Sequence, residues 1–309
     1  SPFLQPILLE TIRFDCSLSL ISSFGILRIM LKAKIESFTN LLGLPRSLSF
    51  VLFTSLLGSA FALSNDLIRV ALIFASNLAL LSFAQVYKHI HQAPADALEP
   101  DPKTPNPIAR GELSLYSPRF AALLLFLFTL ISAWKLGGGN LILVLMGLLV
   151  SVSLYNPSIY LSSRPMFGLS SHNWILGALM TANAMLTTQN HFMVFDKIIP
   201  ILFVLSFYFL YRSFELKCCQ KTGHLSNLMQ ALFAVFLLLT ALLTLFSLKP
   251  FPLWVIALLV LLIAIRLALR NTELPKESSG SIHMIFNYFE SSAAIAFLVN
   301  FIITSIKFR

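Results

Sequence analysis

The chain has 309 residues, of which 57% are hydrophobic and 11% are charged, and its formal net charge is +9. Soluble domains carry roughly 25% charged residues, so this composition excludes an ordinary soluble protein and indicates an integral membrane protein. The positive charge indicates membrane topology and attraction to anionic lipid headgroups, and we expect no nucleic-acid partner.

The N-terminal part, residues 1–47, precedes the main apolar region. Within it, residues 24–42 carry Arg28, Lys32 and Lys34 among apolar side chains. This pattern predicts an amphipathic helix lying at the membrane interface, with a tenth span as the alternative. Residues 48–309 form the predicted membrane domain.

Nine apolar segments in that domain predict an all-α integral membrane protein with nine transmembrane helices. The segments lie at about 48–63, 70–87, 120–136, 141–155, 173–188, 198–211, 228–248, 251–269 and 284–306. The 22 Lys and Arg residues divide into 16 on one side of these segments and 6 on the other. By the positive-inside rule the N-terminus is cytoplasmic, as are polar loops expected at 88–118, 156–171 and 212–225.

The first of these loops contains the longest polar stretch of the chain, KHIHQAPADALEPDPKTPNPIARGELS, at residues 88–114. Asp96, Glu99 and Asp101 could bind a hard cation, although His89 and His91 are spaced for one face of a strand and not of a helix. Prolines from Pro94 to Pro107 predict that no long helix continues through the loop. The possible anion-binding side chains here are Lys88, His89, His91, Lys103 and Arg110.

Two further loops add polar side chains to the same predicted side of the membrane. One follows the fourth segment and contains Tyr155, Asn156, Tyr160 and Arg164; the other follows the sixth and contains Arg212, Glu215, Lys217, Lys221 and His224. A helical bundle with these groups over one end would suit an amphiphile with an anionic head and a hydrocarbon tail. The alternative is that these charges only set the topology.

Three stretches resemble the UbiA superfamily of intramembrane prenyltransferases, in particular its lycopene-elongase-like and archaeal-lipid branches. They are NPIARGELS at 106–114, LYNPSIYLSSRP at 154–165 and ELKCCQKTGH at 215–224. The resemblance implies a nine-helix bundle that binds a prenyl diphosphate through Mg²⁺ held by two aspartate-rich motifs, NDxxDxxxD and DxxxD. It also implies that Asn106, Arg110, Tyr155 and Arg164 lie near the diphosphate.

Both aspartate-rich motifs are degraded in this chain. In register with the family, the first becomes KHIHQAPAD, where Asp96 alone remains, and the second becomes ELKCC, where Glu215 replaces the first Asp. Lys88 and Lys217 place positive charge where a metal ion would bind, which argues against ordinary Mg²⁺-dependent catalysis.

The first functional hypothesis is therefore a divergent prenyltransferase acting on a prenyl diphosphate or a similar isoprenoid amphiphile. Asp96 and Glu215 would be catalytic and a lipid or aromatic acceptor would enter from the bilayer. A remaining metal would use Asp96, Glu99 and Asp101, and the diphosphate would contact Lys88, Asn106, Arg110, Tyr155, Arg164 and Lys217.

The alternative is a non-catalytic pseudoenzyme, serving as a lipid- or pigment-binding or scaffold subunit with protein partners in a membrane complex. A transporter has less support, because the predicted spans contain few ionisable side chains.

Overall fold

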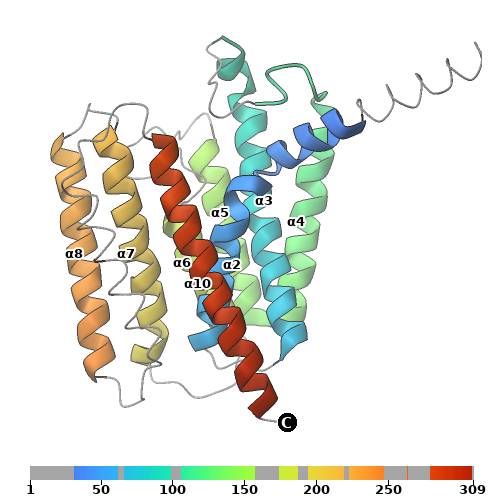
Figure 1. Ribbon diagram of the computed structural model, residues 1–309. Helices are drawn as coiled ribbons and strands as arrows, with labels where there is room; N and C mark the ends of the chain where they lie inside the picture. Colours follow the sequence, from blue (N-terminus) through green and yellow to red (C-terminus); the bar gives the residue numbers. More distant parts are fainter. Residues whose placement is uncertain are drawn as a thin grey trace, which may run out of the picture.

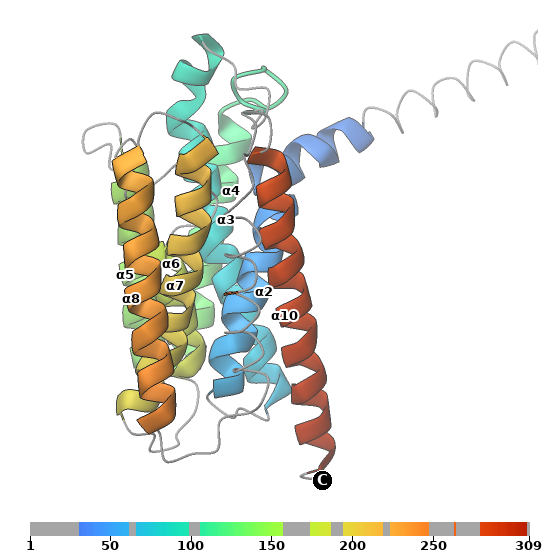
Figure 2. The same ribbon diagram turned by 60° about the vertical axis from the view of Figure 1, so that its left-hand side comes forward.

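The computed structural model describes residues 31–61, 66–98, 106–156, 174–186, 194–218, 223–246, 263 and 279–307. Within these ranges the regular elements are helices (Figure 1). Residues 31–41 form a helix that extends sideways from one end of the bundle (Figure 2). The numbered helices are α2 (Leu44–Phe61), α3 (Leu67–Leu98), α4 (Tyr116–Leu136), α5 (Gly138–Tyr155), α6 (Trp174–Met185), α7 (Val194–Cys218), α8 (Gly223–Phe246) and α10 (Ser279–Lys307).

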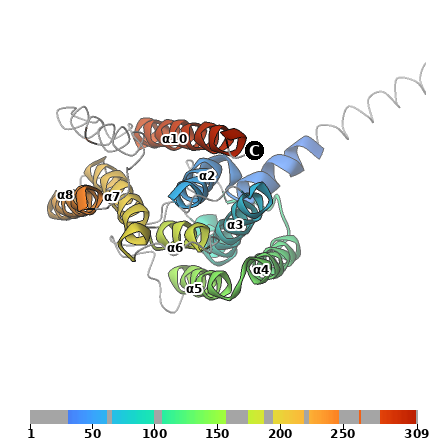
Figure 3. The same cartoon turned by 90° about the horizontal axis from the view of Figure 1, so that it is seen from below.

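The helices run alternately up and down, so their ends gather at two opposite ends of the bundle (Figure 1). We call the end where α3, α5 and α7 finish and α2 and α10 begin the loop end. Seen along the bundle, α2 and α6 lie in the middle, with α7 and α8 to one side and α3 and α4 to the other (Figure 3). Residues far apart in sequence therefore meet at the loop end.

Five of the described helices contain segments that are long and apolar enough to cross a membrane. They are Leu67–Leu98, Tyr116–Leu136, Gly138–Tyr155, Ile198–Leu216 and His224–Thr244. Shorter apolar helical stretches lie in α2, α6 and α10. The described part of the chain is all-helical and the protein is an integral membrane protein, as its composition and apolar segments predicted.

Most of the predicted spans coincide with one helix each, from α2 to α8 and again at α10. The predicted span at 251–269 lies outside the described residues except for Ile263, which is helical. Residues 31–41 form a helix inside the predicted interfacial segment at 24–42, and the rest of that segment before residue 31 is not described.

Two helices run further toward the loop end than the sequence predicted. α3 continues to Leu98 and contains Pro94, so residues 88–98 of the expected polar loop are helical and Pro94 does not end the helix as predicted. A proline removes one backbone donor and pushes against the carbonyls of the preceding turn. The carbonyl left without its helical donor is that of Ile90, four residues before Pro94, and beside it the Asn106 side-chain amide donates to the His89 carbonyl at 2.9 Å. Similarly, α7 reaches Cys218, so residues 212–218 are helical.

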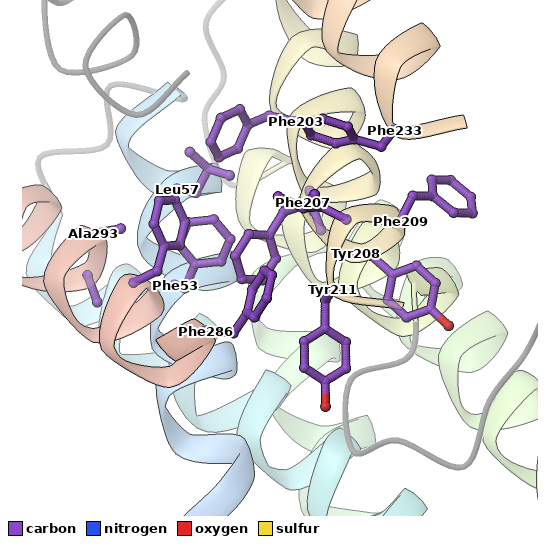
Figure 4. Packing of buried hydrophobic residues seen from close by; sticks show 14 of the residues in the cluster. Phe53, Leu57, Phe203, Phe207, Tyr208, Phe209, Tyr211, Phe233, Phe286 and Ala293 are labelled. Carbon is purple, nitrogen blue, oxygen red and sulfur yellow. The ribbon is translucent and has the colours of Figure 1, made fainter. Parts of the chain in front are cut away.

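Aromatic side chains fill the interface of α2, α7 and α10 (Figure 4). The Phe207 ring lies 5.3 Å from Phe53, 5.3 Å from Phe286 and 5.1 Å from Phe289, measured between centroids. Such pairs contribute about 0.5–1.5 kcal/mol each beyond the burial of their area. The cluster holds α7 and α10 firmly against α2 directly below the polar groups of the loop end.

Small residues allow α2 and α6 to pack backbone against backbone. A Cβ atom added at Gly58 would lie 2.6 Å from the carbonyl oxygen of Thr181, a distance too short for any side chain. Close approach at small residues is the usual way in which membrane helices gain packing energy. The centre of the bundle is therefore tight.

Three buried asparagines join the central helices. Asn183 on α6 donates to Asn77 Oδ1 on α3 at 2.9 Å and accepts from Asn140 on α5 at 2.8 Å. Asn77 in turn donates to Ser55 on α2 at 2.9 Å. All three asparagines are at most 2% exposed. The network fixes the relative register of α2, α3, α5 and α6.

Candidate functional site

Asn106 organises the first polar cluster at the loop end. Its side chain is buried, and its Nδ2 donates to Asp96 Oδ2 at 2.8 Å as well as to the His89 carbonyl. Its Oδ1 accepts from the Ile108 amide at 3.1 Å. The following turn ends at Gly111, whose φ of 71° is a left-handed conformation that glycine adopts without strain. The predicted substrate residue Asn106 and the predicted catalytic residue Asp96 are thus in direct contact.

The helical conformation of residues 88–98 decides which side chains lie beside Asp96. Positions 89, 92 and 96 are spaced three and four residues apart, so they share one face of α3. Here they are His89, which is buried, Gln92 and Asp96. Lys88 precedes this face and is partly buried. Carboxylates at positions 89, 92 and 96, the register expected for the first motif, would therefore be neighbours on α3.

Arg110 belongs to a second cluster. Its guanidinium lies 3.6 Å from the Glu112 carboxylate, and its side chain is 51% exposed. Glu112 also accepts a hydrogen bond from Ser37 at 2.6 Å, which ties this turn to the helix at residues 31–41. Exposed ion pairs contribute at most about 1 kcal/mol. Arg110 is thus positioned by surface contacts that an anionic ligand could replace at little cost.

The C-terminal part of α7 contains Arg212, the most buried Lys or Arg side chain among the described residues of the predicted loops. The Arg212 side chain is 10% exposed and is paired with Glu215 one turn later. Both lie on the last turns of α7, next to Tyr208 and Tyr211, which are almost fully buried. The hydroxyls of these tyrosines point away from the rings of Phe53 and Phe207 (Figure 4). Arg212, Tyr208 and Tyr211 thus offer anion-binding donors above an apolar cluster.

A buried carboxylate from α10 completes this second group. Glu290 is fully buried, and its Oε2 accepts a hydrogen bond from Ser49 on α2 at 2.7 Å. It interacts electrostatically with Tyr211, as do Glu215 and Arg212. Buried ionisable groups among membrane helices are rare and usually functional.

Tyr155, the last residue of α5, borders the same group. It is 3% exposed and lies within electrostatic range of Tyr208. The predicted substrate residue Tyr155 and the predicted catalytic residue Glu215 therefore both neighbour Tyr208.

Several predicted site residues are not located by the structure. Glu99, Asp101 and Arg164 lie outside the described residues, and Lys217 is placed on α7 without a described side chain. The sequence prediction also omitted Tyr208, Tyr211 and Glu290, and it placed Arg212 among the polar loop residues without naming it as a diphosphate contact. Glu290 and Arg212 could have been found from the sequence, because each is a charged residue inside or beside a predicted apolar span.

The described residues do not fit a Mg²⁺ site built from two carboxylate motifs. Within the described ranges, no three His, Cys, Asp or Glu side chains form a group that could hold a metal ion. Glu215 is paired with a cation, and Asp96 shares its face of α3 with His89 and Gln92 in place of acidic side chains. Among the described residues, the buried part of this region combines Arg212 and the hydroxyls of Tyr155, Tyr208 and Tyr211 with the carboxylates of Glu290 and the partly buried Glu215.

Comparison with known proteins gives a structural relationship without a sequence match. No protein-family profile matches the chain, and no curated protein matches it at a significant level. A UbiA homologue from Archaeoglobus fulgidus bound to GPP and Mg²⁺ is 13% identical and has a TM-score of 0.60, covering 84% of this chain and 99% of that one. The same homologue bound to DMAPP and Mg²⁺ gives 14% identity and a TM-score of 0.59 over 84% and 99% of the two chains.

A structure of digeranylgeranylglyceryl phosphate synthase is also similar. It is 17% identical, has a TM-score of 0.59 and covers 87% of this chain and 99% of that chain. At such identities the likeness establishes the fold alone. The chain has a UbiA-type fold, as its sequence predicted.

Proposed function

We propose that this protein binds a prenyl diphosphate, or a similar isoprenoid amphiphile, at the loop end of its bundle. The observation that carries the proposal is the match to 99% of a UbiA homologue solved with GPP and Mg²⁺. On this proposal the chain is a relative of the lycopene-elongase-like branch, has nine spans with the loop end in the cytoplasm, and is a divergent prenyltransferase.

Arg212 is the proposed principal ligand of the diphosphate. It is buried, it neighbours two tyrosine hydroxyls, and its partner Glu215 is on the same helix, so the pair can separate without moving α7. Charge-assisted hydrogen bonds from arginine to phosphate are strong because both partners are ionised. Lys88, Asn106, Arg110, Tyr155, Arg164 and Lys217 remain the proposed secondary contacts.

The chemical step would be the transfer of the prenyl group to a lipid or aromatic acceptor. The bond between the prenyl carbon and the diphosphate oxygen breaks, and diphosphate leaves carrying the electrons of that bond. An electron pair of the acceptor forms the new bond to the prenyl carbon, and the acceptor then releases a proton to solvent or to the departing diphosphate. Donors already aimed at the leaving group stabilise the charge that develops on it. Arg212 and the neighbouring hydroxyls would do this without a pair of acidic motifs, and Asp96 and Glu215 are the carboxylates proposed to take part in catalysis.

The second candidate is a non-catalytic subunit that binds a lipid or pigment or acts as a scaffold in a membrane complex. One observation favours it: both remaining motif carboxylates are engaged within the protein, Asp96 with Asn106 and Glu215 with Arg212. Carboxylates that serve only to hold helices and turns together would need no substrate.

The test is calorimetric titration of the full chain in nanodiscs with geranylgeranyl diphosphate, with excess Mg²⁺ and separately with a chelator. We expect binding that depends little on Mg²⁺, because cationic side chains would capture the diphosphate. Absence of binding in both conditions would contradict the proposal and favour the scaffold. Where binding occurs, release of diphosphate in the presence of candidate acceptors distinguishes the enzyme from a non-catalytic binder.

A further inference from the structure

A groove lies between α3 and α4, away from the cluster around Arg212. It has a volume of about 340 Å³ and is lined by residues of both helices. Pockets for small ligands range from about 300 to 1,000 Å³, so this groove can hold part of a lipid molecule. In the view along the bundle, α4 lies at the edge, on the other side of the molecule from α7 and α8 (Figure 3).

The groove also faces away from Asp96. Its α3 residues include Phe83, Tyr87 and His91, which recur every four residues. At about 100° per residue, this stripe is roughly 120–200° around α3 from His89, which shares a face with Asp96. The groove is therefore separate from the proposed prenyl diphosphate site.

One end of the groove is cationic and the rest is apolar. Arg119, in the first turn of α4, is exposed and interacts electrostatically with His91. Deeper along α4 lie Leu123 and Phe126, the latter seven residues or about 10 Å beyond Arg119. A ligand that fits both parts must have an anionic head and an apolar tail.

Aromatic rings form a continuous wall along the groove. Measured between ring centroids, Tyr87 lies 4.3 Å from His91 and 5.9 Å from Phe83. The Phe83 centroid lies 6.1 Å from that of Phe126 on the opposite helix. Tyr87 and His91 bring hydrogen-bond donors to the polar end of this wall. Packed rings of this kind are pre-ordered, so a ligand would lose little affinity in arranging them.

The groove opens toward the surface that faces lipid. Leu123, on its rim, is 53% exposed, and α4 carries other exposed apolar side chains along the same side, among them Phe120, Leu127 and Ile131. A dissolved anion would gain nothing from this apolar portion, whereas a membrane lipid reaches it by lateral diffusion. Charge complementarity with Arg119 selects an anionic lipid over a zwitterionic one.

We propose that the groove between α3 and α4 binds an anionic phospholipid, with the phosphate at Arg119 and His91 and an acyl chain along Phe83 and Phe126. The proposal concerns a lipid that stays bound at the outer face of the bundle, and it is independent of the prenyl diphosphate site.

The test is native mass spectrometry of the full chain in detergent, titrated with phosphatidylglycerol and, in parallel, with phosphatidylcholine. We expect tighter retention of phosphatidylglycerol, weakened about fivefold by Arg119→Gln and restored by Arg119→Lys. Ala122→Trp, which fills the groove without changing charge, should also reduce retention. Lys135→Gln, at the far end of the same helix, should leave retention unchanged.

Circular dichroism and size-exclusion profiles would confirm that each variant is folded before its lipid binding is compared. Equal retention of the two lipids, or unchanged retention in both Arg119→Gln and Ala122→Trp, would overturn the proposal. Displacement of the lipid by millimolar inorganic phosphate would show a site for a dissolved anion and would also overturn it. Displacement of the lipid by geranylgeranyl diphosphate would mean that the groove belongs to the prenyl diphosphate site, and this result would overturn the proposal too.

Discussion

The side-chain amide of Asn106 bridges Asp96 and the backbone of His89, with hydrogen bonds of 2.8 Å to the carboxylate and 2.9 Å to the carbonyl. It therefore ties the turn that precedes α4 to the last turns of α3, where Pro94 interrupts the backbone hydrogen bonding. One residue thus orients Asp96 and stabilises the helix end that carries it.

Asn106→Ala should destabilise the loop end of the protein. The substitution leaves a partly buried carboxylate and a buried carbonyl without this donor, and each loss of this kind costs about 1–3 kcal/mol. We expect a lower unfolding free energy in mixed micelles with increasing dodecyl sulfate, and faster proteolysis after α3. Thr39→Ala, which removes a surface hydroxyl bonded to the Glu36 carbonyl, is the control and should change neither quantity. Equal stability of the Asn106→Ala variant would mean that the bridge does not hold the turn.

Substitutions at Arg212 and Glu215 should change prenyl diphosphate affinity in opposite directions. Arg212→Gln removes the buried donor and should weaken binding roughly 10- to 100-fold, the range expected for a hydrogen bond to a charged group. Glu215→Gln removes the carboxylate that competes for Arg212 and should tighten binding measured without metal. Titration calorimetry in nanodiscs measures both changes.

Arg69→Gln provides a matched control for the Arg212 substitution. Arg69 is an exposed arginine in the first turn of α3, at the end of the bundle opposite the loop end. Its Nε lies 3.3 Å from Asp66 Oδ2. Its loss should leave prenyl diphosphate affinity unchanged. The proposed role of Arg212 would be refuted if its substitution and that of Arg69 had the same effect, or if Glu215→Gln weakened metal-free binding.

The asparagine network should behave as one cooperative unit. Asn183→Ala removes the contacts to both Asn77 and Asn140, so it should lower the unfolding free energy by about 1–3 kcal/mol, more than substitution of Asn140 alone. Asn183→Ala combined with Asn140→Ala should cost less than the sum of the single changes, because the two residues share hydrogen bonds. Thr129→Val, which removes a bond to the Leu125 carbonyl in the same helix, is the control. Additive effects in the asparagine pair would show that the hydrogen bonds between helices are independent of one another.

The sequence predicted the helical bundle well because lipid imposes a simple rule on it. A spanning segment must be apolar over most of its length and must satisfy its backbone internally, so Leu141 to Tyr155 or Phe120 to Leu136 could be recognised from composition alone. The ends of α3 and α7 were predicted poorly because they leave the apolar region. Pro94 and the charges near Lys217 indicated a loop, whereas the helices continue there, with Asn106 bonded to the His89 carbonyl on α3 and Ser226 of α8 donating to the Ser213 carbonyl on α7.

The sequence indicated those candidate site residues that lie close together along the chain, and it missed those that meet only when the helices pack. Asn106 and Asp96 are only ten positions apart, so both could be recognised as candidate site residues within one short stretch of sequence. Glu290 reaches Ser49 from 241 positions away, and no local pattern in either segment indicates that pairing. Tyr208 and Tyr211 look like ordinary apolar residues of a span until the bundle places them beside Arg212.

Restoring two carboxylates on α3 should create a dependence on Mg²⁺. In His89→Asp combined with Gln92→Asp, three carboxylates including Asp96 would share one helical face, and Mg²⁺ bridging between carboxylates and phosphate is the usual arrangement for this ion. We expect geranylgeranyl diphosphate to bind more tightly with Mg²⁺ than with a chelator in this variant, while the unaltered protein shows little difference. The control is His89→Asn combined with Gln92→Asn, which introduces side chains of the same size as Asp and also removes the buried imidazole, but adds no charge. Its affinity for geranylgeranyl diphosphate should not increase with Mg²⁺. If the acidic variant is folded and its affinity remains independent of Mg²⁺, then residues 89, 92 and 96 do not face the diphosphate, and the alignment of KHIHQAPAD with the family's first motif is incorrect.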